Sequence, residues 1–199
     1  MEAWGYIAEM EVNLFVESPA LPALCDALRN CKSLKTLALN GVELWDDMVV
    51  AGQLILAMVE LPVLQEVSLC RNSMDETPDQ RAVGECLAYL VAHSSSLRIL
   101  RVDGNNLGEA GMALPFLVMH LKAGLEMLNF DGSCSFEEFS ADFARKVILP
   151  AVRANKRLRR LYVPYCMEDS YGMPADELRP AMEEVKILKA RRLADEEAA

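Results

Sequence analysis

A triplet of large apolar residues at offsets 0, 3 and 5 recurs six times along the chain, and this recurrence limits the possible folds more than any other feature. The clearest copy runs from Leu97 to Leu107 and reads LRILRVDGNNL. In this copy Leu97, Leu100 and Val102 would point into a core from a short strand. Asn105 can bond the backbone where the chain turns out of that strand. One such unit cannot bury its own apolar face, so it requires neighbours.

The other copies follow at a regular spacing. The six copies start at residues 7, 34, 64, 97, 125 and 158, which lie 27 to 33 residues apart. The triplets of the other five are Ile7, Met10 and Val12; Leu34, Leu37 and Leu39; Leu64, Val67 and Leu69; Leu125, Leu128 and Phe130; and Leu158, Leu161 and Val163. Three apolar residues at the same offsets in six places indicate a repeat architecture.

Helical periodicity appears between these strands. The predicted inner faces are Leu21, Leu24 and Leu28; Val83, Leu87, Leu90 and Val91; Leu114, Leu117, Val118 and Leu121; and Phe139, Phe143 and Val147. A strand followed by a helix at this period predicts an α/β solenoid with about six strand–helix units, in which neighbouring repeats share one core.

Strand and helix at this spacing resemble the leucine-rich-repeat superfamily in its long, ribonuclease-inhibitor-like form, over about residues 7–166. In the central copy the asparagine, leucine, glycine and leucine positions of that form hold Asn105, Leu107, Gly111 and Leu114. The position of Asn105 is taken in other copies by Val42, Ser133 and Cys166, which interrupts the asparagine ladder. The resemblance implies a short curved parallel sheet with helices on its convex side, and a role in protein recognition.

The whole chain, residues 1–199, is expected to form a single leucine-rich-repeat domain. Residues 1–33 would be an N-terminal capping repeat, and residues 34–166 would be the core repeats. Residues 167–199 would form a C-terminal cap with a frayed tail, because Pro180 suits the first turn of a capping helix.

Charge and composition exclude several classes of function. The net charge is −10, and only the last part of the chain is slightly basic, so nucleic acid is not an expected partner. The longest nearly apolar run, residues 48–59, is shorter than the roughly 18–20 residues of a membrane span, so no membrane insertion is expected. Six cysteines without a C-x-x-C pair are typical of reduced thiols, which favours a cytoplasmic protein. The resemblance to leucine-rich-repeat proteins adds association with the cytoskeleton as an expectation.

One stretch imitates a calcium site. Residues 127–139 match an EF-hand loop at five positions, but the first ligand position holds Met127, which offers no oxygen. Because the stretch also fits the repeat register, a strand and turn is preferred to the calcium alternative. No nucleophile elbow, zinc-binding helix or phosphate loop occurs, so we expect no enzyme activity, no metal and no cofactor.

Two surfaces are candidate partner sites. On the concave face, Arg101 and Tyr162 are the expected anchors, because these residue types are common binding hot spots. The second surface is a rim of inserted residues between strand and helix, which holds Trp45, Asp75, Glu76, Phe136 and Glu137. The rim is slightly preferred, and its acidic character predicts a basic docking surface on the partner. The alternative is that the rim is a set of solvated loops whose two aromatic side chains lie in the core.

The resemblance to leucine-rich-repeat proteins, together with the absence of catalytic motifs, implies a non-catalytic protein–protein interaction module. The preferred role is a scaffold or adaptor subunit of a larger intracellular assembly, with cytoskeletal and ciliary assemblies as the typical settings. The alternative is a regulator of an enzyme, such as a small-GTPase activator or an enzyme inhibitor.

Overall fold

A parallel six-stranded sheet in chain order, β1-β2-β3-β4-β5-β6, organises the protein. The computed structural model describes residues 8–13, 20–73, 79–119, 124–133, 140–164 and 178–197. The strands are β1 (Glu9–Asn13), β2 (Thr36–Asn40), β3 (Glu66–Ser68), β4 (Ile99–Arg101), β5 (Met127–Asn129) and β6 (Arg160–Tyr162). Each strand begins two residues after a predicted copy start, so the repeat register is confirmed.

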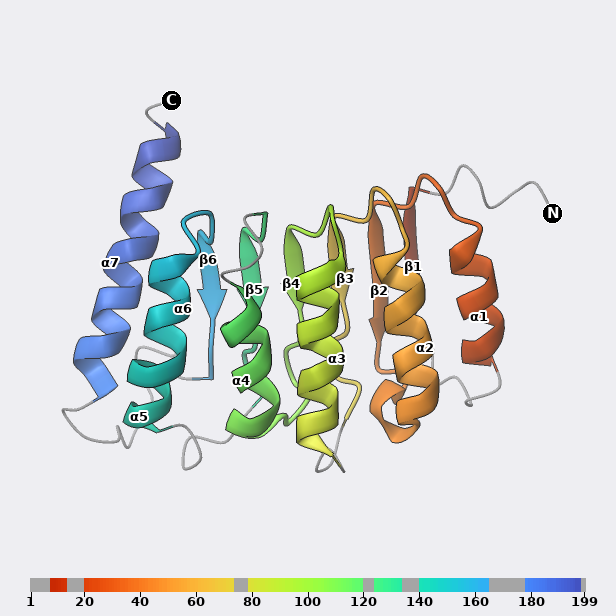
Figure 1. Cartoon of the computed structure of the whole chain (residues 1–199), viewed down its shortest axis with the longest axis horizontal. Helices are drawn as coiled ribbons and strands as arrows, with labels where there is room; N and C mark the ends of the chain where they lie inside the picture. The colour runs from red at the N-terminus through yellow and green to blue at the C-terminus, as the bar shows by residue number, and fades with distance from the viewer. Residues whose placement is uncertain are drawn as a thin grey trace.

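Helices follow the strands and line one face of the sheet (Figure 1). They are α1 (Ala20–Arg29), η2 (Leu44–Asp46), α2 (Met48–Val59), α3 (Gln80–His93), α4 (Gly108–Met119), α5 (Ala141–Phe143), the π-helical segment η3 (Ala144–Ile148), α6 (Leu149–Ala154) and α7 (Leu178–Glu197). The expected fold class, a strand–helix α/β solenoid with a C-terminal helix, is therefore confirmed.

The core lies between the sheet and the helices and is continuous from repeat to repeat. The register pairs Leu37 with Val67, Val67 with Leu100, Leu100 with Leu128 and Leu128 with Leu161. In the five copies that start at residue 34 or later, every triplet residue is at most 1% exposed. Each such side chain contributes about 1.5–3 kcal/mol on burial, and its burial depends on contacts with neighbouring repeats.

Asparagine side chains connect successive repeats where the strands end. The Asn72 side chain accepts a hydrogen bond from the Val42 N–H at 2.9 Å and donates one to the Leu39 carbonyl at 2.7 Å. One repeat later, the Asn105 side chain accepts from the Asn72 N–H at 2.8 Å. These buried backbone groups are therefore satisfied by side chains of the next repeat.

The sequence predicted a break in the asparagine ladder at Ser133. The hydrogen-bond ladder instead continues at this position through the serine hydroxyl. Ser133 Oγ donates to the Val102 carbonyl at 2.9 Å, so serine supplies the donor that the asparagine amide supplies elsewhere. Val42 has no polar side chain to contribute to the ladder. Its backbone N–H takes part instead, by donating to Asn72 Oδ1. Cys166 lies outside the described residues.

The buried face of α4 differs from the predicted one. Leu117 was expected in the core and is 50% exposed, whereas Phe116 is fully buried and contacts Phe130 with 5.5 Å between the ring centroids. The helix is apolar on most sides, so periodicity alone could not fix its orientation. Close helix packing fixes it, because a Cβ at Gly84 of α3 would lie only 2.7 Å from the carbonyl oxygen of Gly111 in α4.

Helix α7 closes the C-terminal end of the described sheet (Figure 1). Lys189 donates to the Leu161 carbonyl of β6 at 2.9 Å, and Arg192 donates to the carbonyls of Leu158 and Val152 at 2.7 and 2.6 Å. Burial lowers the pKa of Arg192. The buried apolar residues of α7 are Ala181, Met182 and Val185. These two cationic side chains of α7 thus satisfy backbone carbonyls of β6, of the turn before it and of α6, and α7 lies at the end of the sheet where another strand could pair.

Paired substitutions in β4 test the register. Leu100→Ala should lower the free energy of unfolding by about 2–5 kcal/mol, because it leaves a cavity in the shared core. Ile99→Ala, on the half-buried opposite side of the same strand, should cost much less. Chemical denaturation of the two variants measures both values, and equal losses would contradict the assignment of Leu100 to the core.

Candidate partner-binding site

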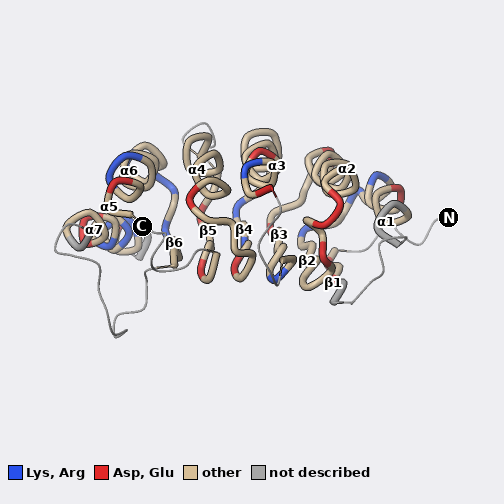
Figure 2. Tube along the Cα trace, turned by 90° about the horizontal axis from the view of Figure 1, so that it is seen from below, with Lys and Arg blue, Asp and Glu red and all other residues tan. Residues whose placement is uncertain are grey.

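The face of the sheet opposite the helices is the first candidate surface. Figure 2 shows the helices along the outer side of a curved array and the strands along the inner side. We call this inner side the concave face. Register places one residue from each strand side by side in its middle row, which consists of Glu11, Ala38, Ser68, Arg101, Asn129 and Tyr162. None of the described helices covers this row.

Both expected anchors lie on the concave face. Arg101 on β4 is 43% exposed and pairs with Glu66 of β3, with 3.2 Å between Nε and Oε1. Tyr162 on β6 is 40% exposed, and the Lys189 ammonium lies 5.7 Å from its ring centroid. The two anchors lie two strands apart on one surface, with Asn129 of β5 between them. Their neighbours hold both side chains in place while leaving much of each accessible.

Charge changes sign along this face. Glu9, Glu11 and Glu66 lie on β1 to β3, whereas Arg160 lies on β6. Beyond β6, Lys189 of α7 adds a second cation. A partner that binds along the face would therefore meet an acidic end and a basic end, which favours one orientation of docking.

A hydrogen-bond network joins four strands at the carboxyl end of the concave face. Asn40 Oδ1 accepts from Ser68 Oγ and from the Cys70 N–H, both at 2.8 Å. Asp103 Oδ1 accepts from Cys70 Sγ at 3.0 Å and from Asn129 Nδ2 at 2.9 Å. The repeat pattern of the sequence did not predict this network. Its only signal is that polar residues follow the buried triplet positions in several copies.

Cys70 is the side chain in this network with the most reactive functional group. Burial first, and then the hydrogen bond to Asp103, together raise the pKa of its thiol to about 11. A thiol of this kind stays protonated near neutral pH, so it is a poor nucleophile and a poor metal ligand. The arrangement thus serves to order the surface rather than to carry out covalent chemistry.

The prediction that Trp45 is a partner-binding residue of the rim is wrong. Its side chain is 1% exposed, and its indole Nε1 donates to Asn105 Oδ1 at 2.9 Å. The buried amide satisfies the indole N–H, so the short η2 turn packs the ring into the core. The other rim residues, Asp75, Glu76, Phe136 and Glu137, lie outside the described residues and remain predictions.

The described segments contain no cluster of metal ligands and no membrane-spanning helix. Among the described residues, no group of three or more His, Cys, Asp or Glu side chains could hold a metal ion. In the same segments, no helix combines the length and the apolar character needed to cross a bilayer. Met127, the first position of the EF-hand match, lies in β5 and is 7% exposed, and residues 134–139 of that match are not described.

These features define a strand–helix α/β solenoid in which the described helices leave one face of the sheet open. No family model and no curated protein sequence matches the chain. Solved structures do match. The C-terminal domain of Caenorhabditis elegans tropomodulin superposes with a TM-score of 0.67 at 18% identity, covering 89% of this chain and 98% of that domain.

A second structure, described as actin-binding site 2 of leiomodin-1, superposes with a TM-score of 0.48 at 16% identity. That match covers 98% of this chain and 85% of the leiomodin-1 chain. The tropomodulin match shows that this chain has the fold of that domain, and at these identities neither match identifies a partner.

The thiol of Cys70 offers a direct test of the concave network. At pH 8 a pKa of about 11 leaves roughly one thiol in a thousand ionised, about a hundredfold less than for an ordinary cysteine. Iodoacetamide should therefore modify Cys70 slowly in the native protein, as followed by peptide mass spectrometry. Asp103→Ala removes an acceptor that raises the pKa and should speed the reaction, whereas rapid modification of the unaltered protein at pH 8 would contradict this environment.

Calcium should leave the protein unchanged. Met127 offers no oxygen and is buried in β5, so millimolar calcium and a chelator should give the same melting temperature. Differential scanning fluorimetry measures this. A melting temperature that rises steadily with calcium concentration, as linkage requires of a bound ligand, would restore the EF-hand interpretation.

Proposed function

We propose that this chain is a non-catalytic protein–protein interaction module that holds a partner protein on its concave face. The observation that carries the proposal is a six-stranded sheet face that no described helix covers, on which the side chains of Arg101 and Tyr162 are accessible and held by neighbouring side chains. Arginine and tyrosine anchors often dominate the energy of protein interfaces. Side chains that are already ordered lose less entropy on binding, which favours affinity.

The role that we propose is a scaffold or adaptor subunit of a larger assembly, with a cytoskeletal or ciliary assembly as its setting. Repeat solenoids present long surfaces made of equivalent positions, which suits them to recognising proteins. The change of charge along the concave face suits a partner whose own surface is basic at one end and acidic at the other. This pattern refines the basic docking surface that the acidic rim predicted.

Substitutions on the concave face test the proposal. The tagged protein is used to purify partners from cell extract, with actin filaments and microtubules as defined baits for the cytoskeletal setting. For a partner recovered in stoichiometric amounts, Arg101→Glu and Tyr162→Ala should each weaken binding by about 1–2 kcal/mol or more, roughly tenfold.

Matched changes on the helical side provide the controls. Lys146→Glu reverses a charge on a side chain that is 72% exposed, and Leu117→Ala removes an exposed apolar side chain; both should leave affinity unchanged. Melting curves verify that all four variants are folded. If Phe136→Ala weakens binding while the concave variants bind normally, the rim rather than the concave face holds the partner. A partner whose enzymatic rate changes at small amounts of this chain would instead support the regulator alternative.

A further inference from the structure

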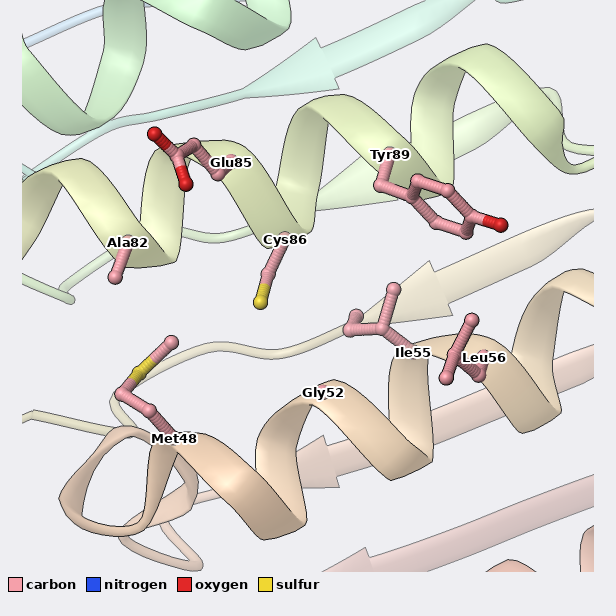
Figure 3. Close-up of a pocket in the computed structure, with 8 residues that line it drawn as sticks. All are labelled: Met48, Gly52, Ile55, Leu56, Ala82, Glu85, Cys86 and Tyr89. Carbon is pink, nitrogen blue, oxygen red and sulfur yellow. The ribbon is translucent and has the colours of Figure 1, made fainter.

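A second surface lies on the other side of the molecule, between α2 and α3. The two helices enclose an apolar groove of about 400 Å³ (Figure 3). Leu56 and Tyr89 in its walls are 48% and 42% exposed. The α2 wall includes Met48, Gly52 and Leu56, and the α3 wall includes Ala82, Cys86 and Tyr89.

Glycine keeps this groove open. A Cβ at Gly52 would meet no atom within 4 Å, whereas a Cβ at Gly84, on the opposite side of α3, would overlap Gly111. Packing therefore explains the glycine at position 84 but not the one at position 52. Glycine inside a helix lowers stability relative to alanine, so the space at Gly52 is kept at a cost to α2.

The apolar positions follow the spacing of helix packing. Met48, Gly52 and Leu56 recur every four residues along α2, and Ala82, Cys86 and Tyr89 recur every three or four residues along α3. Two such stripes facing each other form a groove that the ridge of a third helix can enter. Val49, 71% exposed, lies beside the α2 stripe and extends its apolar surface towards solvent.

The surroundings of the groove are acidic. Within residues 43–60 and 79–93 there is one basic side chain other than histidine, Arg81, and it pairs with Glu85 of the groove wall at 3.2 Å. The carboxylates of these two stretches are Glu43, Asp46, Asp47, Glu60, Asp79 and Glu85, and all six residues are exposed. A ligand that fills the groove therefore gains from positive charge at its flanks.

We propose that the α2–α3 groove is a docking site for an amphipathic helix of a partner protein, which inserts apolar side chains between the two helices and carries Lys and Arg on its flanks. The helix-in-groove mode explains the apolar walls, and the exposed carboxylates of residues 43–60 and 79–93 favour a cationic ligand. Because the groove and the concave face lie on opposite sides of the sheet, one chain can hold two partners at once.

A library of phage-displayed helical peptides, selected on the intact protein, tests this proposal. Selected peptides should carry apolar residues at i, i+4 and i+7 with Lys or Arg beside them, and their affinity should fall as salt is added. Fluorescence anisotropy then measures binding to variants. Gly52→Leu fills the groove and should weaken binding at least about tenfold, while its melting temperature should not fall, because a Cβ at this position clashes with nothing.

A second pair of variants keeps the proposal testable even if Gly52→Leu does not fold. Leu56→Ser should weaken peptide binding, whereas Leu117→Ser, at an equally exposed leucine of α4, should not. Arg101→Glu should have no effect, which separates the groove from the concave face. The proposal is overturned if no peptide is selected, if the selected peptides are acidic, or if they bind the groove variants normally. Self-association of the protein that Gly52→Leu abolishes would assign the groove to a second copy and also overturn it.

Discussion

The side-chain amide of Asn105 connects three repeats, and the turns that follow β2, β3 and β4 depend on it. Its Oδ1 accepts from Trp45 Nε1 at 2.9 Å and from the Asn72 N–H at 2.8 Å. Its Nδ2 donates to the carbonyls of Leu69 and Val102 at 2.8 and 2.6 Å. The Val102 carbonyl also accepts from Ser133 Oγ, and each buried group left without any partner by loss of the amide would cost about 1–3 kcal/mol. The same amide that aligns neighbouring turns therefore also fixes Trp45 in the core.

This interaction explains which parts of the structure could be predicted from sequence. The strand triplets were predictable because each position, such as Leu100 or Leu128, faces the same shared core in its repeat, so the pattern recurs. The position of Trp45 was not predictable, because it depends on a hydrogen bond to a residue 60 positions away. The face of α4 was also missed, because the approach of Gly84 to Gly111 outweighs an apolar pattern that covers most of the helix.

The candidate site, like the fold, could be predicted from sequence only in part. Alternation along the strands was enough to place Arg101 and Tyr162 on the concave face. The bonds of Asp103 to Cys70 and Asn129 depend on how three strands align, and no single repeat contains that information. The α2–α3 groove depends on the space between two helices, so it became visible only when both were in place. The described helices leave one face of the sheet open, and the apolar groove lies on the other side, so the two surfaces could hold the two partners that we propose.

Site-specific photo-crosslinking tests most directly whether the concave face holds the partner. A benzophenone amino acid replaces Ala38, in the middle row of that face, or Leu117, which is 50% exposed on the helical side. We predict that irradiation of the purified assembly joins the partner to position 38 and not to position 117. A crosslink from position 117 alone, or none from position 38 while the partner still co-purifies, would contradict binding on the concave face.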